Sequence, residues 1–295
     1  MSIQVEGLTH IYAAGTPLAK MALADLSFRI EDGSCVAIIG VTGSGKSTLV
    51  QHFNGLLRPT SGRVVVNGVE VGAKGADLAK LRQRVGLVFQ SPETQLFART
   101  VFEDAAFGPR QAGMSEVKVA QLVGEALRLV GLPDKEFGLR DPFSLSGGQM
   151  RRAALAGVLA MEPAILILDE PTAGLDGEGR AELYHFLRQV RAERRTTILL
   201  VSHDMGEVAA LAEQALALHQ GRLVLQGSPR ELFGQAHLLT EWGLDVPPLS
   251  QVAAILRKQG FSIPAEALSL DEMTHALLAG WPQVGSVNGA QRNAE

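Results

Sequence analysis

The chain has 295 residues, of which 46% are hydrophobic, so it can bury a large core and is not disordered as a whole. Its 27 Lys and Arg residues against 31 Asp and Glu residues give a net charge of −4. This is the wrong sign for a protein held mainly on a phosphate backbone, and we expect no nucleic-acid partner. The single cysteine, Cys35, excludes an internal disulfide and favours a reducing cytoplasm.

The N-terminus lacks the pattern of a signal peptide. The most apolar stretch, residues 153–161, is too short to span a bilayer. Any membrane role should therefore be peripheral.

Short apolar runs alternate with longer amphipathic stretches, which is typical of an α/β protein with a mainly parallel sheet. The clearest strands are expected at residues 35–39, 85–89, 165–168 and 197–201, and polar or glycine-rich residues follow each of them. Since open parallel sheets place ligands at the carboxyl ends of their strands, we expect the functional residues there.

Two additions to this sheet are expected in the first part of the chain. Alternating apolar and polar residues at 3–8, 23–30 and 63–66 predict an antiparallel β subdomain. Helical periodicity replaces the strand pattern in the middle of the chain and predicts an inserted α-helical subdomain, about residues 91–160.

A last hairpin, residues 215–226, should complete a first domain that covers residues 1–228. Residues 229–282 are expected to form a C-terminal helical extension, in which the clearest helices are residues 249–259 and 270–278. The polar residues 283–295 predict a disordered tail.

A glycine-rich segment directly after the strand at residues 35–39 matches the phosphate-loop pattern G-x-x-x-x-G-K-[ST]. In such a loop, backbone N–H groups face the β-phosphate and the following helix N-terminus adds its positive dipole. Lys46 would neutralise phosphate oxygens and Ser47 would ligate Mg²⁺. A glycine turn without a ligand is the alternative, but the strand before and the helix after favour a nucleotide site. Its expected residues are Gly40, Thr42, Gly43, Ser44, Gly45, Lys46, Ser47 and Thr48.

Two carboxylates, Asp169 and Glu170, follow the aliphatic residues 165–168. On a buried strand beside a phosphate loop, Asp169 would lie near Mg²⁺, either directly or through a water. Glu170 could polarise the water that attacks the γ-phosphate. The alternative is an ordinary surface turn after a buried strand.

Residues 145–149 read LSGGQ at the start of a predicted helix, where N–H groups form a second site for an anion, although Ser146 alone would simply cap the helix. With the phosphate loop and the Asp-Glu pair around it, the chain resembles the nucleotide-binding ATPase of ABC transporters. The resemblance implies a P-loop NTPase fold, ATP with Mg²⁺, and two ATPases that share their nucleotides. The residues it assigns to the ATP of the opposite subunit are Ser146, Gly147, Gly148 and Gln149.

The same resemblance implies roles for four more residues. Tyr12 would stack on adenine. Gln90 would reach Mg²⁺ and the attacking water, and Asp176 would join the two subunits. His203 would contact the γ-phosphate and order Glu170, which completes a catalytic set with Gln90 and Lys46.

Aromatic residues are frequent in residues 91–109, after Gln90, and such a patch suits a partner helix, unless it packs on the helical subdomain. Here and at residues 15–17, 149–152 and 156–163, the chain resembles energy-coupling factor (ECF) ATPases of the A-prime type.

That resemblance implies an ATP-hydrolysing subunit of an importer for vitamins or transition-metal ions, at the cytoplasmic side of the cell membrane. Its partners would be a second ATPase, either a paralogue or a second copy, a transmembrane coupling (T) protein and a substrate-capture (S) protein. The alternative is a soluble ABC ATPase that acts on nucleic acid or the ribosome. The single phosphate loop and the acidic balance disfavour it.

Overall fold

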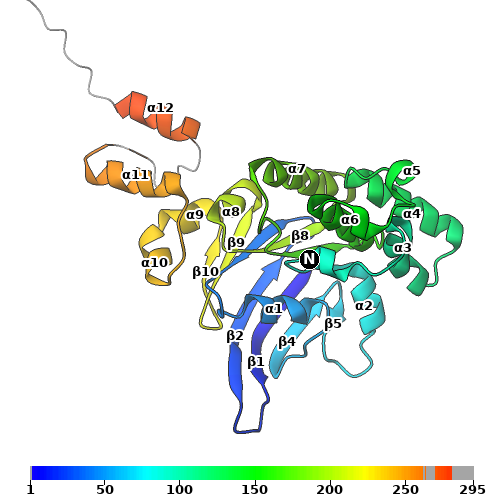
Figure 1. Ribbon diagram of the computed structural model, residues 1–295. Helices are drawn as coiled ribbons and strands as arrows, with labels where there is room; N and C mark the ends of the chain where they lie inside the picture. The colour runs from blue at the N-terminus through cyan, green and yellow to red at the C-terminus, as the bar shows by residue number, and fades with distance from the viewer. Residues whose placement is uncertain (1, 262, 264–269, 281–295) are drawn as a thin grey trace, which may run out of the picture.

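The computed structural model describes residues 2–261, 263 and 270–280, so the expected disordered tail at residues 283–295 lies outside the described residues. A six-stranded sheet forms the centre of the molecule (Figure 1). Five neighbouring strands, from β9 to β6, are parallel, and β10 is antiparallel to β9. From one edge to the other the strands are β10 (Arg222–Gly227), β9 (Gln214–His219), β3 (Cys35–Ile39), β8 (Thr197–Ser202), β7 (Ile165–Asp169) and β6 (Val85–Val88).

The continuous apolar sequence of these strands follows from burial on both faces. In β7, Leu166 and Leu168 pack into the core shared with the helical subdomain, whereas Ile165 and Ile167 pack into the core shared with the second sheet. This alternation explains the continuous aliphatic run of β7, which lies inside the sheet, whereas β6 is its edge strand.

The predicted antiparallel sheet is also present, and its strands are longer than the sequence suggested. In spatial order it contains β2 (Lys20–Ile30), β1 (Ile3–Tyr12), β4 (Ser61–Val66) and the short β5 (Val69–Glu70). Helix α1 (Lys46–Phe53) contributes Leu49, Val50 and Phe53 to the core of this sheet, and Phe53 is fully buried. The helix that carries the phosphate loop is thereby fixed between the two sheets.

Helices gather at one end of the central sheet, where the sequence predicted an inserted subdomain (Figure 1). Side-chain caps define the first turns of the three long ones, with Thr100, Ser115 and Ser146 at the N-cap positions. The elements are η1 (Pro92–Gln95), α3 (Val101–Gln111), α4 (Glu116–Leu129), α5 (Asp134–Phe137), η2 (Pro142–Ser144) and α6 (Gly147–Leu159), and α2 (Leu78–Arg84) precedes β6.

After β7, α7 (Gly177–Arg194) and α8 (Met205–Leu211) flank β8 in the chain. The hairpin of β9 and β10 is followed by α9 (Pro229–Gly234) and α10 (Ala236–Glu241), of which α10 was not expected from the sequence. Both short helices pack on the central sheet through a cluster that extends to Val246.

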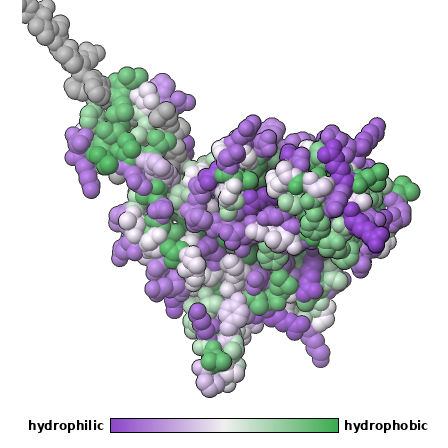
Figure 2. Space-filling view, in the orientation of Figure 1, coloured by the Kyte–Doolittle hydropathy of each residue, from purple (hydrophilic) through white to green (hydrophobic). Residues whose placement is uncertain are grey.

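The two helices predicted near the C-terminus are present as α11 (Pro248–Lys258) and α12 (Leu270–Gly280). They have a small cluster of their own, centred on Ala253, Ile263 and Met273. They project from the side opposite the helical subdomain (Figure 1), and apolar surface lies over them (Figure 2).

Candidate functional site

The phosphate loop lies between the carboxyl end of β3 and the start of α1, as the motif requires. Gly43 and Gly45 have φ values of 83° and 105°, in the region that favours glycine. The Lys46 ammonium donates to the carbonyl oxygens of Gly40 at 2.6 Å and Val41 at 3.1 Å, so the loop curves around its own lysine. Burial lowers the pKa of Lys46, and the carboxylates of Glu170 and Asp169 oppose that shift. Within the loop, Thr42 and Ser47 are exposed and Ser44 is buried.

Asp169, the last residue of β7, meets the phosphate loop. The Ser47 hydroxyl donates to Asp169 Oδ2 at 3.4 Å. Burial, with the neighbouring Glu170, raises the pKa of the Asp169 carboxyl, and the bond from Ser47 lowers it. A hydroxyl and a carboxylate are oxygen donors of the kind that Mg²⁺ prefers together with phosphate oxygens, so these residues fit the ion implied by the sequence.

Glu170 and His203 are brought together from the ends of two adjacent parallel strands. His203 Nδ1 lies 2.7 Å from Glu170 Oε2. The Glu170 side chain is 15% exposed and the His203 side chain is 71% exposed. Glu170 has a φ of 52°. This backbone conformation costs free energy in a residue with a side chain, and residues that adopt it cluster at functional sites. The Glu170 N–H donates to the carbonyl oxygen of Val201 at 2.8 Å, which holds it in that conformation.

Tyr12 ends β1 and reaches the helix of the phosphate loop. Its hydroxyl lies 3.1 Å from Thr48 Oγ1, and the residue is 40% exposed. The ring packs edge-on against His10, with 4.6 Å between the centroids. An exposed aromatic face beside a phosphate loop is available for stacking with a planar base.

The LSGGQ segment forms the N-terminus of α6. Ser146 and Gln149 make a reciprocal capping box, so the hydroxyl accepts from the Gln149 N–H while the Gln149 side chain accepts from the Ser146 N–H. Gly147 and Gly148 are exposed at this helix end. The capping serine predicted from the sequence is therefore present, and the exposed glycines leave the helix end accessible.

Arg151, one turn into α6, links the LSGGQ segment to Gln90 and to the turn after β7. Its guanidinium donates to the carbonyl oxygens of Gln90 and Ala173, both at 2.9 Å. A cavity of about 350 Å³ adjoins it, lined among others by Gln90, Gly147 and Gly148. Gln90 therefore lies beside the LSGGQ segment. No role for Arg151 could be predicted from the sequence, because the residues it contacts are distant in the chain.

Asp176, the predicted contact between subunits, is the N-cap of α7. Its Oδ1 accepts from the Gly179 N–H at 2.8 Å, and the residue is exposed. The helix-capping alternative is therefore realised in this chain, and exposure leaves Oδ2 accessible as well.

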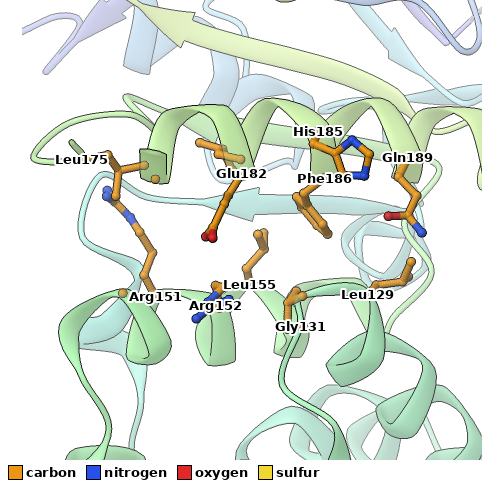
Figure 3. Close-up of a pocket in the computed structure, with 14 residues that line it drawn as sticks. Leu129, Gly131, Arg151, Arg152, Leu155, Leu175, Glu182, His185, Phe186 and Gln189 are labelled. Atoms are coloured by element: carbon orange, nitrogen blue, oxygen red, sulfur yellow. The ribbon is translucent and has the colours of Figure 1, made fainter. Parts of the chain in front are cut away.

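An apolar cleft of about 300 Å³ separates α6 from α7 (Figure 3). Glu182 points from α7 towards α6, which contributes Arg152 and Leu155 to the lining, and Phe186 lies further along the α7 side. The helical subdomain is therefore incompletely packed against α7.

The aromatic patch after Gln90 is exposed in part. Phe97 and Phe107 are 61% and 48% exposed, and their rings pack edge to face with centroids 5.0 Å apart. Asp104 Oδ2 accepts from the N–H groups of Phe97 and Ala98, which fixes the loop in front of α3. A groove of about 280 Å³ beside these rings extends to Met161.

Among the described residues, we find no helix with the length and hydropathy needed to cross a membrane.

Comparison with known proteins identifies the family. Residues 23–173 match the family model described as ABC transporter. The energy-coupling factor transporter ATP-binding protein EcfA2 of Symbiobacterium thermophilum is 52% identical over 277 residues, which cover 94% of this chain and 96% of the relative. The protein of the same name from Caldanaerobacter subterraneus subsp. tengcongensis is 47% identical over 278 residues, or 94% and 97% of the two chains.

Solved structures agree with these relatives. The chain resembles cbiO1 from Clostridium perfringens, described as part of the ABC transporter complex cbiONQ, with a TM-score of 0.72 and 36% identity over 85% of this chain and 97% of that one. It also resembles a dimeric, post-hydrolysis structure of the ATP-binding cassette MJ0796 with ADP and Pi, with a TM-score of 0.68 and 27% identity over 77% and 98% of the chains. The chain therefore belongs to the ABC transporter ATPases, among the ATP-binding proteins of energy-coupling factor transporters.

Proposed function

We propose that this protein binds and hydrolyses ATP to drive an importer of the energy-coupling factor type. The pairing of His203 with Glu170, at the sheet edge that also carries the phosphate loop, is the observation that carries the proposal. Relatives with 52% and 47% identity over nearly the whole chain are named ATP-binding proteins of such transporters, which supports it. Vitamins or transition-metal ions are the proposed cargo class.

The nucleotide would lie along the phosphate loop, with adenine on Tyr12 and the phosphates at the N-terminus of α1. Ser47, Gln90 and Asp169 would hold Mg²⁺, Asp169 directly or through a water. The bound ion would neutralise charge on the phosphate oxygens. The loop N–H groups and Lys46 do the same from the other side, because dipole and charge both favour an anion there.

Glu170 is the proposed general base. Its carboxylate would accept a hydrogen bond from the attacking water. His203 would orient that carboxylate through the contact of 2.7 Å between His203 Nδ1 and Glu170 Oε2. Glu170 directly follows the end of β7, and its positive φ is a strained conformation of the kind found at functional sites.

The exposed N-terminus of α6 would complete the site of a second ATPase. Its capping box satisfies the Ser146 and Gln149 N–H groups, and the exposed Gly147 and Gly148 allow a phosphate to approach closely. The dimeric form of MJ0796 supports such a pair. The second subunit would be a paralogue or a second copy, with Asp176 at the shared interface.

The groove beside Phe97 and Phe107 is the proposed contact with the transmembrane coupling (T) protein, because an apolar groove beside exposed aromatic rings suits a partner helix. A substrate-capture (S) protein would join through that complex. We place the subunit at the cytoplasmic face of the cell membrane.

The test is Glu170→Gln in the assembled transporter. The variant keeps the size of the side chain and removes the base, so we expect ATP affinity within about threefold of wild type and turnover at least roughly 100-fold lower. ATP binding and phosphate release are the two measurements. Glu178→Gln in the exposed first turn of α7 is the matched control and should leave both unchanged. Unchanged turnover in Glu170→Gln would refute the assignment of the base.

A further inference from the structure

A buried carboxyl group with no role in the scheme above lies close to the catalytic pair. Glu207, in α8, is fully buried. Its Oε2 accepts a hydrogen bond from Thr172 Oγ1 at 3.4 Å. The Ser202 hydroxyl is a neighbour that lowers the pKa of this carboxyl, and Oε1 has no hydrogen-bond partner among the described residues. Burying a carboxyl group with an unpaired oxygen reduces the stability of the fold, so we expect Glu207 to serve a function that offsets this cost.

The positions of these two hydroxyls show which segments Glu207 lies between. Thr172 lies in the turn after β7, two residues beyond Glu170, and is 3% exposed. Ser202 is the last residue of β8, directly before His203, and is fully buried. The Glu207 carboxyl therefore hydrogen-bonds the turn that follows Glu170, while α8, to which Glu207 belongs, begins two residues after His203.

Further contacts fix the start of α8 in the same place. Asp204 Oδ1 accepts from the Gly206 and Glu207 N–H groups at 2.8 Å and 3.2 Å. Its Oδ2 accepts from Arg180 Nη1 at 2.6 Å, and Arg180 Nε donates to the Leu175 carbonyl oxygen at 3.4 Å. The segment that carries His203 is thus tied to α7 on one side and to the turn after Glu170 on the other.

We propose that Glu207 is a positioning residue, which holds His203 against Glu170 by joining the turn after β7 to α8, the helix that follows His203. The inference rests on the proposed hydrolysis of ATP and adds a residue that does not touch the nucleotide. In this proposal the distance between His203 and Glu170 is set by a residue in the protein interior, because His203 itself is mostly exposed.

The protonation of Glu207 supports this role. Burial raises the pKa of Glu207 to about 7, the hydroxyls of Ser202 and Thr172 oppose the shift, and the carboxylates of Asp204 and Glu170 add to it. Tyr184 of α7 and Cys35 of β3 also lie close enough to Glu207 for their pKa values to be affected by its charge. Arg180 of α7 is paired with Asp204. A neutral Glu207 can bridge the two segments without repelling Glu170.

The sign of the pH dependence follows. The pKa of Glu207 in the folded protein lies above its ordinary value of 4.5, so the folded state keeps a proton that the unfolded state has lost. Stability from this group is therefore fully present below pH 4.5 and declines as the pH rises towards 7. Glu207→Gln stays neutral, and its Tm should exceed that of wild type by an amount that grows over this range.

The decisive experiment compares Glu207→Gln with Glu207→Leu in the assembled transporter. The amide retains an oxygen that can accept from the Thr172 hydroxyl, so Gln should keep kcat within about threefold of wild type. Leu removes the bridge, so kcat should fall roughly 10-fold or more, while KM for ATP stays within about twofold because the phosphate loop is untouched. Glu193→Leu, on the exposed part of α7, is the control and should change neither constant.

Equal loss of kcat in the Gln and Leu variants, or a wild-type kcat in Glu207→Leu, would overturn the proposal. If Glu207→Leu does not fold, Thr172→Val and Ser202→Ala decide, because each removes one hydroxyl and should lower kcat. A wild-type kcat in both would also overturn it. If the wild-type assembly shows no ATP turnover, the proposed function is refuted. That outcome is distinct from the variant results that would refute only the role of Glu207.

Discussion

At the scale of single residues, the site depends on backbone conformations that most side chains avoid. Gly45 has a φ of 105°, and a Cβ there would lie 2.7 Å from Leu23 Cδ2 and 2.8 Å from the Ala22 carbonyl oxygen. Glu170 has a positive φ although it has a side chain, and the hydrogen bond from its N–H to the Val201 carbonyl oxygen stabilises that conformation. The phosphate loop is therefore fixed by contact with β2 as well as by its own sequence.

Gly45→Ala should consequently reduce both stability and nucleotide binding. The added methyl group meets a backbone oxygen that cannot move freely, so we expect ATP affinity to fall at least roughly 10-fold and unfolding free energy to fall by about 1–3 kcal/mol. Thermal unfolding and ATP titration are the measurements.

Gly177→Ala, at the start of α7, is the matched control. A Cβ there meets nothing within 4 Å, and the residue is not at positive φ. Normal ATP affinity in Gly45→Ala would contradict the geometry of the loop.

At the scale of secondary-structure elements, two glycines show how context decides the sign of one substitution. Gly124 lies inside α4, where an added Cβ has open space, whereas Gly86 lies in β6, where a Cβ would be 2.5 Å from Val158 Cγ1 of α6. Helix α4 retains the flexibility of its glycine without a packing benefit. Close approach of α6 to the sheet requires the glycine in β6.

Gly124→Ala should therefore stabilise the protein by about 0.5–1 kcal/mol, since alanine restricts the unfolded chain and suits a helix interior. Gly86→Ala should destabilise it by about 1–3 kcal/mol, since the core at Val158 is overpacked. Urea unfolding of the full chain measures both. Effects of the same sign would show that packing between β6 and α6 is looser than described.

At the scale of the whole molecule, packing suggests where the main unit ends. We proposed residues 1–228 from the sequence, but α9, α10 and the segment to Val246 share a core with β3 and β9, while α11 and α12 have their own small cluster. We therefore propose that the main unit extends to Val246.

Truncation tests this boundary. A chain that ends at residue 247 loses α11, α12 and the exposed ion pair between Arg230 and Glu272, and a pair of that kind contributes about 1 kcal/mol or less. Its Tm should stay within about 4 °C of the full chain. A chain that ends at residue 235 also loses Leu239, Leu244 and Val246 from the core, so its Tm should fall by at least roughly 10 °C. Similar Tm values for both truncations would place the boundary at or before residue 235.

Much of the architecture could be predicted because local patterns carry it. Continuous aliphatic runs identified β3, β7 and β8, since burial on both faces demands apolar side chains at every position. The edge strand β6 was identified from a shorter apolar run that contains Gly86. The short helix α10 was missed because its six residues give too little periodicity.

The sequence by itself determined which chemistry this protein carries. The phosphate loop, Asp169 with Glu170, and the LSGGQ segment are contiguous motifs, because each uses neighbouring backbone groups at one strand end or helix start. The resemblance implied that His203 would order Glu170, whereas the tertiary structure alone decided the geometry of this contact and which other residues meet across the chain. The contacts of Glu170 with His203, of Tyr12 with Thr48 and of Glu207 with Thr172 join separate segments, and their distances depend on strand register and helix packing.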